Sequence, residues 1–418
     1  MITRSSRIVA ASIVLLAFSL IAPVAQALPA FARRYNFKCS VCHTNGAAPH
    51  LTEFGYIFRR MAFHLPGELG NKQADAQGMT ITNHMAVGVN VGYKYSATTA
   101  AGSTTLNDNG IEIPEVEIWP LVGGFLGNWG VWSEMDAAPP TSGGGLAMGM
   151  ADVRYAFGTP NLFYNFRAGW LAPEGYGASD QWLDDGNIPL MDQLSPFKNQ
   201  NTLALPFGAM GEGVQQGFEA GLNYRESHLT LGYYDGFDGT SGSIAPANIK
   251  AHGAGSRDVK VQLDQFVGNI GEVTLGYYNG SIPLVFGAGP DTWLDDFNQE
   301  RIYVTYHAVP KVDIVAGAGW AQNHYVTTTT TPEGTFDSNG GFVGAFYYAL
   351  PHLVIALRGD KYNYNSSQSA TGYSLQASIP YSNRILVFHI NSTVSALSED
   401  AIAQGQTTDV GVVLRFLM

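Results

Sequence analysis

Five consecutive residues, Cys39-Ser40-Val41-Cys42-His43, have the types and spacing needed for redox chemistry. The spacing C-x-x-C-H is the attachment signature of a c-type haem. The two thiols form thioethers with the haem vinyl groups, and the adjacent imidazole binds the iron as its proximal ligand. Cys39 and Cys42 are the 2 cysteines of the whole chain. The sequence therefore predicts one covalently bound haem c with His43 on its iron.

Two other uses of a C-x-x-C pair fit this sequence less well. A thioredoxin-like redox pair lies in a strand–helix–strand setting, which the residues around the motif do not predict. A structural zinc site needs four ligands, and the chain has no second cysteine pair. We therefore prefer the haem interpretation.

A predicted export signal precedes the haem motif. Arg4 and Arg7 stand before an apolar stretch from Ile8 to Val24, and Ala25-Gln26-Ala27 matches a cleavage site. This order predicts a secretory signal peptide over residues 1–27 rather than a permanent membrane anchor. Export suits the haem, because c-type attachment takes place on the exported side of the inner membrane.

Residues 28–78 predict a small helical segment that carries the haem. Thr52 is a candidate N-cap, and Pro66-Gly67 is a candidate helix end. Between His50 and His64, apolar residues recur at helical spacing: Leu51, Phe54, Ile57, Phe58 and Met61. A segment of this length has too little core to fold alone, so we expect it to plug a larger domain.

That larger domain, residues 79–418, has the composition of an outer-membrane β-barrel. Only 13% of the chain is charged, 12% is aromatic, and 49 residues are glycine. The net charge of −12 argues against a nucleic-acid partner. Apolar and polar residues alternate, as in Val153/Tyr155/Phe157, Val259/Val261/Leu263, Ile302/Val304/Tyr306 and Val410/Val412/Leu414. One face of such strands suits lipid and the other suits a wet interior.

The sequence predicts an all-β fold: a sixteen-stranded antiparallel transmembrane β-barrel with a small N-terminal helical haem segment. A soluble sandwich or propeller is the alternative, but its outer face would be polar. Connections alternate between tight turns and longer loops, as between the periplasmic and extracellular ends of such barrels. The predicted strands lie near 81–95, 111–123, 129–137, 148–158, 162–171, 214–226, 228–236, 256–267, 271–280, 297–308, 311–325, 338–349, 352–363, 369–380, 383–393 and 407–418.

Inward positions of these strands carry both charges. They are Glu115, Glu117, Asp152, Arg154, Arg167, Glu219, Arg225, Lys260, Asp264, Arg301, Arg358, Asp360 and Arg415. Such residues line a water channel in an empty pore, whereas beside a haem their arginines could pair with its propionates. The sequence leaves both interpretations open.

Two predicted long loops share the tetrapeptide W-L-D-D, at Trp182–Asp185 and Trp293–Asp296. Carboxylates attract hard cations, so these loops could attract Fe(II) at the rim, or they could only cap the loops. The four carboxylates concerned are Asp184, Asp185, Asp295 and Asp296.

The specific match to a known family covers Phe31 to Pro66, with the run F-A-R-R-Y-N-F-K-C-S-V-C-H-T and then P-H-L-T-E-F-G-Y-I-F-R-R. This segment resembles the outer-membrane monohaem cytochrome–porin fusion family, the iron-oxidising outer-membrane cytochrome c type. The resemblance implies a bacterial outer-membrane location, with the haem segment in the lumen or on the periplasmic side. It also places Arg59 and Arg60 among the cofactor-binding residues.

The chain departs from the family pattern at Met61-Ala62-Phe63-His64, where a short N-G-Y usually precedes the proline. Met61 and His64 are both candidates for the distal iron ligand, because positions three apart share a helix face. Met61 is preferred, since methionine gives a higher potential than histidine and the donor is ferrous iron. His50 and the barrel histidines, His84, His307 and His389, are further candidates.

The resemblance implies that the protein moves electrons across the outer membrane. It also implies that the protein could act as an Fe(II) oxidase. Extracellular Fe(II) would be the donor, and a periplasmic carrier such as a soluble cytochrome c the acceptor. The alternatives are a passive porin with a haem plug or sensor, an outward electron conduit, and a haem enzyme with an open distal site.

Overall fold

The computed structural model describes residues 30–43, 51–70, 83–100, 103–112, 116–125, 127–138, 145–171, 215–234, 258–285, 292–326, 334–350, 353–364, 369–381, 384–395 and 405–417. The predicted signal peptide, residues 1–27, lies outside these ranges. Three short helices come first: α2 (Ala30–Tyr35), α3 (Cys39–Cys42) and α4 (Glu53–Arg60). Within the described ranges, no helix is both long enough and apolar enough to cross a membrane.

Helix α4 begins where the sequence predicted and ends earlier. The side chain of Thr52 accepts a hydrogen bond from the Gly55 amide at 3.1 Å, which confirms the predicted N-cap. The prediction that the helix runs to Pro66-Gly67 is wrong. Ala62 and Phe63 adopt positive φ angles of 54° and 63°, and this left-handed turn stops the helix at Arg60. His64 therefore lies beyond the helix.

The described strands form one antiparallel sheet. They are β1 (Ala86–Ala100), β2 (Ser103–Glu112), β3 (Val116–Gly124), β4 (Trp129–Ala138), β5 (Gly145–Thr159), β6 (Leu162–Leu171), β7 (Gln215–Tyr224), β8 (Ser227–Tyr234), β9 (Asp258–Val267), β10 (Gly271–Val285), β11 (Thr292–Val309), β12 (Val312–Val326), β13 (Gly334–Leu350), β14 (Leu353–Tyr364), β15 (Ser369–Tyr381), β16 (Arg384–Ser395) and β17 (Gly405–Leu417).

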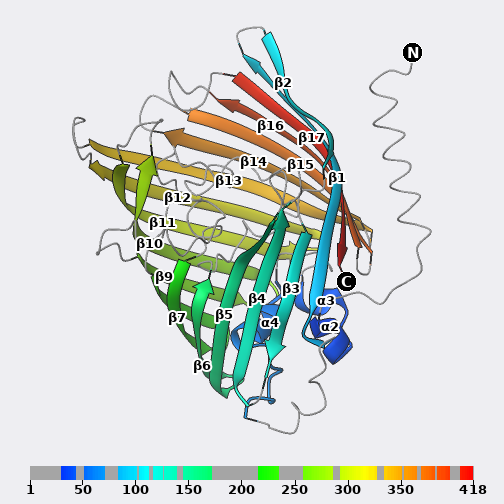
Figure 1. Cartoon of the computed structure of the whole chain (residues 1–418), viewed down its shortest axis with the longest axis vertical. Helices are drawn as coiled ribbons and strands as arrows, with labels where there is room; N and C mark the ends of the chain where they lie inside the picture. Colours follow the sequence, from blue (N-terminus) through cyan, green and yellow to red (C-terminus); the bar gives the residue numbers. More distant parts are fainter. Residues whose placement is uncertain are drawn as a thin grey trace.

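Strand pairing runs around the sheet and returns to β1 (Figure 1). One edge of β1 pairs with β17. Its other edge pairs with β2 over residues 92–100 and with β3 over residues 86–89. Strands β2 and β3 thus share one strand position beside β1. The seventeen described strands therefore fill sixteen strand positions around the barrel. The predicted sixteen-stranded antiparallel barrel is confirmed, with β2 as a strand segment that the sequence did not predict.

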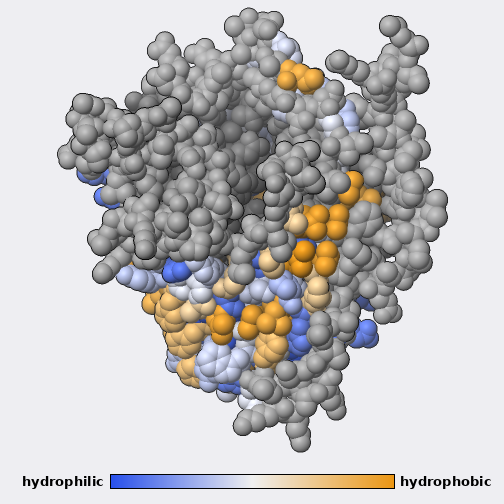
Figure 2. Space-filling model, viewed as in Figure 1, coloured by the Kyte–Doolittle hydropathy of each residue, from blue (hydrophilic) through white to orange (hydrophobic). Residues whose placement is uncertain are grey.

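The predicted alternation of the strands is also observed. In β5, Val153 is 47% exposed on the outer side, whereas Asp152 and Arg154 are buried. In β9, Val259, Val261 and Leu263 are exposed while Asp258, Lys260 and Gln262 are buried. In β17, by contrast, Leu414 is buried. Hydrophobic residues gather on the lower outer wall in Figure 2, as expected of a lipid-facing surface.

The two ends of the barrel differ in their connections. Two or three residues join β5 to β6, β7 to β8, β9 to β10, and β11 to β12. We call this end of the barrel the short-turn end. The helices α2, α3 and α4 lie at the lower end of the barrel in Figure 1, near β1, β3 and β4.

Candidate functional site

The C-x-x-C-H motif lies on α3 and is tied directly to α4. Cys39 and Cys42 are one helical turn apart, and His43 pairs with Leu51 in an antiparallel bridge. The Thr52 hydroxyl donates to the Val41 carbonyl at 2.8 Å, and the Thr52 amide donates to the Cys42 carbonyl at 2.9 Å. The capping residue of α4 therefore also holds the end of α3.

A glycine allows the two helices to touch. A Cβ atom at position 55 would overlap the carbonyl oxygen of Cys42 and would lie 2.9 Å from its Cα atom. Backbone atoms form this contact, so no side-chain rotation relieves it. Gly55 is therefore required for α4 to pass against the haem motif.

Aromatic rings fill the space between α2 and α4. Phe31 lies 5.2 Å from Phe58, Tyr35 lies 5.6 Å from Phe58, and Phe37 lies 5.8 Å from Phe54, measured between ring centroids. Contacts of this kind stabilise packing beyond simple area burial. They pack α2 and Phe37, which stands two residues before Cys39, against α4.

The two candidate distal ligands differ in their surroundings. Met61 is the C-cap of α4 and its side chain is completely buried. His64 is also buried, but Nδ1 lies 3.2 Å from the Met61 carbonyl oxygen and Nε2 lies 3.0 Å from the Phe125 carbonyl oxygen. Since both ring nitrogens face acceptors, His64 would have to release one of them to bind a metal.

The C-terminal end of β3 receives three side chains from the N-terminal part of the chain. Its carbonyl oxygens contact them as follows: Gly124 O accepts from Arg34 Nη1 at 2.5 Å, Phe125 O lies 3.0 Å from His64 Nε2, and Val122 O lies 3.1 Å from His84 Nδ1. The contacts of Arg34 and His64 fasten the helical segment to one side of the barrel, and His84 adds a contact from the residues just before β1.

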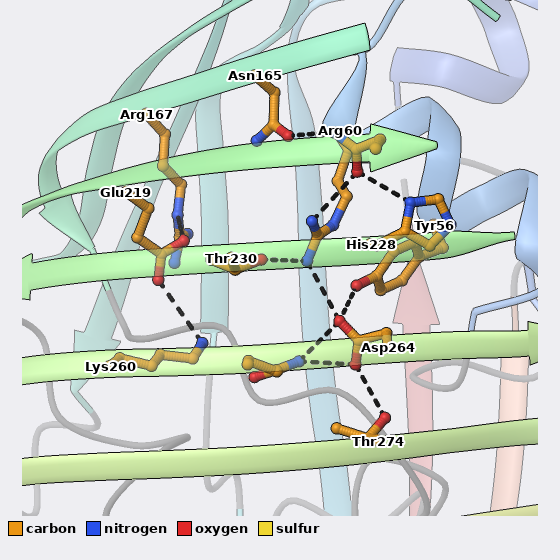
Figure 3. A network of polar contacts seen from close by, with 12 residues as sticks. Tyr56, Arg60, Asn165, Arg167, Glu219, His228, Thr230, Lys260, Asp264 and Thr274 are labelled. Atoms are coloured by element: carbon orange, nitrogen blue, oxygen red, sulfur yellow. Dashed lines mark hydrogen bonds and ion pairs between the residues drawn. The ribbon is translucent and has the colours of Figure 1, made fainter. Parts of the chain in front are cut away.

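The opposite side of α4 is fastened to the inner wall through Asp264 of β9 (Figure 3). The Tyr56 hydroxyl donates to Asp264 Oδ2. Arg60 Nη2 lies 3.4 Å from the same oxygen and donates to Thr230 Oγ1 at 2.5 Å, while Arg60 Nη1 donates to Asn223 Oδ1 at 3.2 Å. All five side chains are buried, so the wall provides a specific receptor for the helix.

The receptor is itself held by further hydrogen bonds. Gln262 Nε2 and Thr274 Oγ1 donate to Asp264 Oδ1 at 2.9 and 2.8 Å. His228 packs against the Tyr56 ring at 5.0 Å, and its Nδ1 lies 2.9 Å from Asn223 Oδ1. Apart from Asp264, these residues were not predicted. The spacing of Tyr56 and Arg60, four apart on α4, was the available signal.

The two predicted cofactor-binding arginines thus face different ways. Arg60 points into the wall receptor. Arg59 stands four positions after Gly55, so it belongs to the helix face that contacts α3. Its backbone carbonyl accepts a hydrogen bond from Arg154 Nη1 at 3.5 Å.

Most of the predicted inward charges are buried and paired with each other. The shortest pairs are Arg154 Nε to Asp152 Oδ1 at 2.6 Å, Arg167 Nε to Glu219 Oε2 at 2.6 Å, and Arg358 Nη2 to Asp360 Oδ1 at 2.7 Å. Arg225 was wrongly predicted to face inward, because it lies exposed in the β7–β8 turn with φ 50°. Glu115 lies outside the described residues, as does the side chain of Arg415.

The structure changes the interpretation of the W-L-D-D repeats. Residues 182–185, with Asp184 and Asp185, lie outside the described residues. Residues 293–296 belong to strand β11, so their assignment to a loop is wrong. They pair with β10 on one side, and Leu294 to Asp296 also pair with β12. Consecutive strand positions alternate between faces, which separates positions 295 and 296. Asp296 is exposed.

The acidic start of α4 lies close to a turn of the barrel wall. Glu53 occupies the first turn of the helix. Burial raises the pKa of its carboxyl above the usual 4.5, and the negative charge of Glu226 raises the pKa further. Glu226 is exposed between β7 and β8, so the helical segment reaches the short-turn end.

Comparison with known proteins identifies the fold. No protein-family model matches the chain, and no curated protein matches it. The structure is similar to the anion-selective porin from Comamonas acidovorans, with 12% identity and a TM-score of 0.56 over 80% of this chain and 98% of that one. It is also similar to the outer membrane channel DcaP of Acinetobacter baumannii, with 9% identity and a TM-score of 0.50 over 80% and 96%. The chain therefore has the porin fold.

Proposed function

We propose that this chain is an outer-membrane cytochrome, in which a porin-like barrel holds one haem c and moves electrons across the outer membrane. One observation carries the proposal: the C-x-x-C-H helix is locked to α4, and α4 is bonded to the inner wall at Asp264. A porin fold alone does not need a haem-attachment motif anchored to its inner wall. The haem, when bound, supplies one-electron chemistry.

The residues present fit a haem c. Cys39 and Cys42 would carry the thioethers and His43 would bind the iron, beside the aromatic cluster of α2 and α4. A haem propionate at Arg60 would have to compete with Asp264, Thr230 and Asn223. We therefore assign the propionate to Arg59, on the helix face toward α3. We favour Met61 over His64 as the distal ligand, since both nitrogens of His64 face carbonyl oxygens.

The barrel ends and the family resemblance support a location for the haem segment and a direction of electron flow. Outer-membrane barrels place their short turns in the periplasm, which would put the haem segment on the periplasmic side or in the adjacent lumen. Extracellular Fe(II) would be the donor, as the resemblance over Phe31 to Pro66 implies. A soluble periplasmic cytochrome c is the kind of acceptor that this position suits.

A passive porin with a haem plug or sensor is the second candidate, and the porin fold favours it. The inner wall supports the conduit instead. Lys260, Asp258 and Gln299 face inward and are completely buried, whereas side chains that line a water-filled pore are hydrated. A wall of buried ion pairs suits a filled barrel better than an open channel.

One experiment separates these functions. The protein, matured with haem, is placed in liposomes that enclose oxidised cytochrome c, and ferrous iron is added outside. Internal reduction that the double variant Cys39→Ala/Cys42→Ala loses would support the inward conduit. Ion conductance without reduction in either protein would support the porin. Reduction of the haem only by a donor on the periplasmic side would support an outward conduit.

A further inference from the structure

One buried arginine on the inner wall differs from all the others that the structure describes. Arg301 lies on β11 and is 6% exposed. The other buried arginines of the described residues each face a carboxylate: Arg60 with Asp264, Arg154 with Asp152, Arg167 with Glu219, and Arg358 with Asp360. Arg301 makes no such pair.

The contacts of Arg301 involve neutral groups only. Nη1 donates to the Tyr303 hydroxyl at 3.1 Å, and Nη2 donates to Gln299 Oε1 at 3.5 Å. Its Nε is buried with no hydrogen-bond partner. The guanidinium also lies 5.9 Å from the Tyr303 ring. A buried positive charge is strongly destabilising unless an opposite charge compensates it.

The register of the sheet places glycines on both sides of Arg301. Arg301 stands opposite Gly276 on β10 and opposite Gly319 on β12. Directly opposite residues are the closest side-chain neighbours across a sheet, and both of these positions lack a side chain. Neither neighbouring strand therefore supplies a side chain at the position directly opposite Arg301 to compensate its charge.

Arg301 also lies near the receptor of the helical segment. Tyr303 stands opposite Thr274, and Thr274 donates to Asp264, which binds Tyr56. Asp264 and Arg301 are two strands apart across the sheet and two residues apart along it, or about 12 Å between Cα atoms. The site is thus in the same part of the lumen as the docked segment.

We propose that Arg301 binds an oxyanion, a carboxylate or a phosphate group, inside the barrel. A guanidinium matches both groups with two parallel hydrogen bonds. The oxyanion could be a haem propionate or a free anion that enters the lumen. The propionate source rests on the proposed function, whereas the free-anion source does not.

The test uses the full-length protein and the variants Arg301→Gln and Arg301→Lys, with Arg225→Gln as the control for loss of an exposed charge. Thermal unfolding is measured in chloride and in inorganic phosphate at equal ionic strength. The haem midpoint potential is measured in the same samples. Each source of the oxyanion predicts a different pattern.

A free oxyanion site predicts that phosphate raises the Tm of the unaltered protein by a few degrees. Phosphate should not change the Tm of Arg301→Gln, and it should raise the Tm of Arg301→Lys by a smaller amount. A propionate site predicts no phosphate effect. Instead Arg301→Gln lowers the Tm in both salts and lowers the midpoint potential, since a nearby positive charge favours the reduced haem. Arg301→Lys should restore part of that potential, and Arg225→Gln should change neither quantity.

Two results would overturn the proposal. In the first, Arg301→Gln unfolds at or above the Tm of the unaltered protein in both salts. The charge of Arg301 would then only destabilise the fold, with no bound anion to compensate it. In the second, Arg301→Gln lowers the Tm while phosphate has no effect and the potential is unchanged, which makes the residue purely structural. If the protein carried no haem, the proposed function would fail, but the phosphate comparison would still test Arg301.

Discussion

The hydroxyl of Tyr56 on α4 donates a hydrogen bond to Asp264 on β9, although the two residues are 208 positions apart in the chain. Arg60, one helical turn further along α4, lies 3.4 Å from the same carboxylate. This single aspartate therefore holds both a phenol and a cation of the helical segment. Its position explains how a segment too small to fold alone acquires a defined place in the barrel.

Replacing Asp264 with asparagine should release the helical segment. Arg60 would remain buried without its opposite charge, and breaking such a pair costs about 3–5 kcal/mol. Protease should then cut residues 30–70 well before the barrel strands, as followed by mass spectrometry of the fragments. Asp313→Asn is the matched control, because Asp313 pairs with His307 and Tyr348 instead. Equal protection of both variants would contradict this role for Asp264.

Gly55→Ala should prevent the normal packing of α3 on α4. The new methyl group would overlap the Cys42 carbonyl oxygen, so one helix must move. Covalent haem, measured by the stain of the denatured protein, should fall severalfold. Gly110→Ala is the control, because a Cβ at position 110 meets no atom within 4 Å. Full haem loading of Gly55→Ala would show that the contact is unimportant for attachment.

If Met61 is the distal ligand, as proposed, Met61→Ala should change the haem spectrum and lower the midpoint potential, because a thioether ligand favours the reduced iron. His64→Gln should keep the low-spin spectrum, since the imidazole of His64 contacts the carbonyls of Met61 and Phe125. Absorption and electron paramagnetic resonance spectra of both variants make the comparison. The opposite pattern would assign the distal position to His64, and unchanged spectra in both would move the ligand to the barrel wall.

Local patterns in the sequence predicted much of this structure. The alternation that buries Lys260 and exposes Val261 depends only on strand geometry, so it can be read directly. The N-cap at Thr52 depends on a hydrogen bond to a residue three positions away, and it could also be predicted. Both features involve neighbours in sequence.

The features that were missed depend on distant residues or on rare backbone conformations. Nothing local shows that Tyr56 meets Asp264, because strand register and helix docking together create the contact. Ala62 and Phe63 seldom adopt positive φ, so the early end of α4 had no sequence signal. Asp295-Asp296 resembles a loop by composition, but pairing with β10 and β12 extends β11 through it. Tertiary pairing overrides local propensity here.

Docking of α4 should weaken as the pH rises. Burial and the charge of Glu226 raise the pKa of Glu53. The docked state therefore binds a proton more tightly than the undocked state does. This stability is fully present below the usual pKa of 4.5 and is lost as the pH rises through the raised pKa. The Tm of the segment, followed through the haem absorbance, should fall across this window.

Glu226→Gln isolates the electrostatic part of that dependence. The variant removes one cause of the raised pKa of Glu53 and leaves burial unchanged. We expect a higher Tm near neutral pH than in the unaltered protein, and a smaller change between about pH 4 and about pH 8. Glu300→Gln is the control, because Glu300 is exposed on β11. If Glu226→Gln and Glu300→Gln gave the same profile, repulsion between Glu53 and Glu226 would not limit docking. Burial of the Glu53 carboxyl alone would then cause the pH dependence of docking.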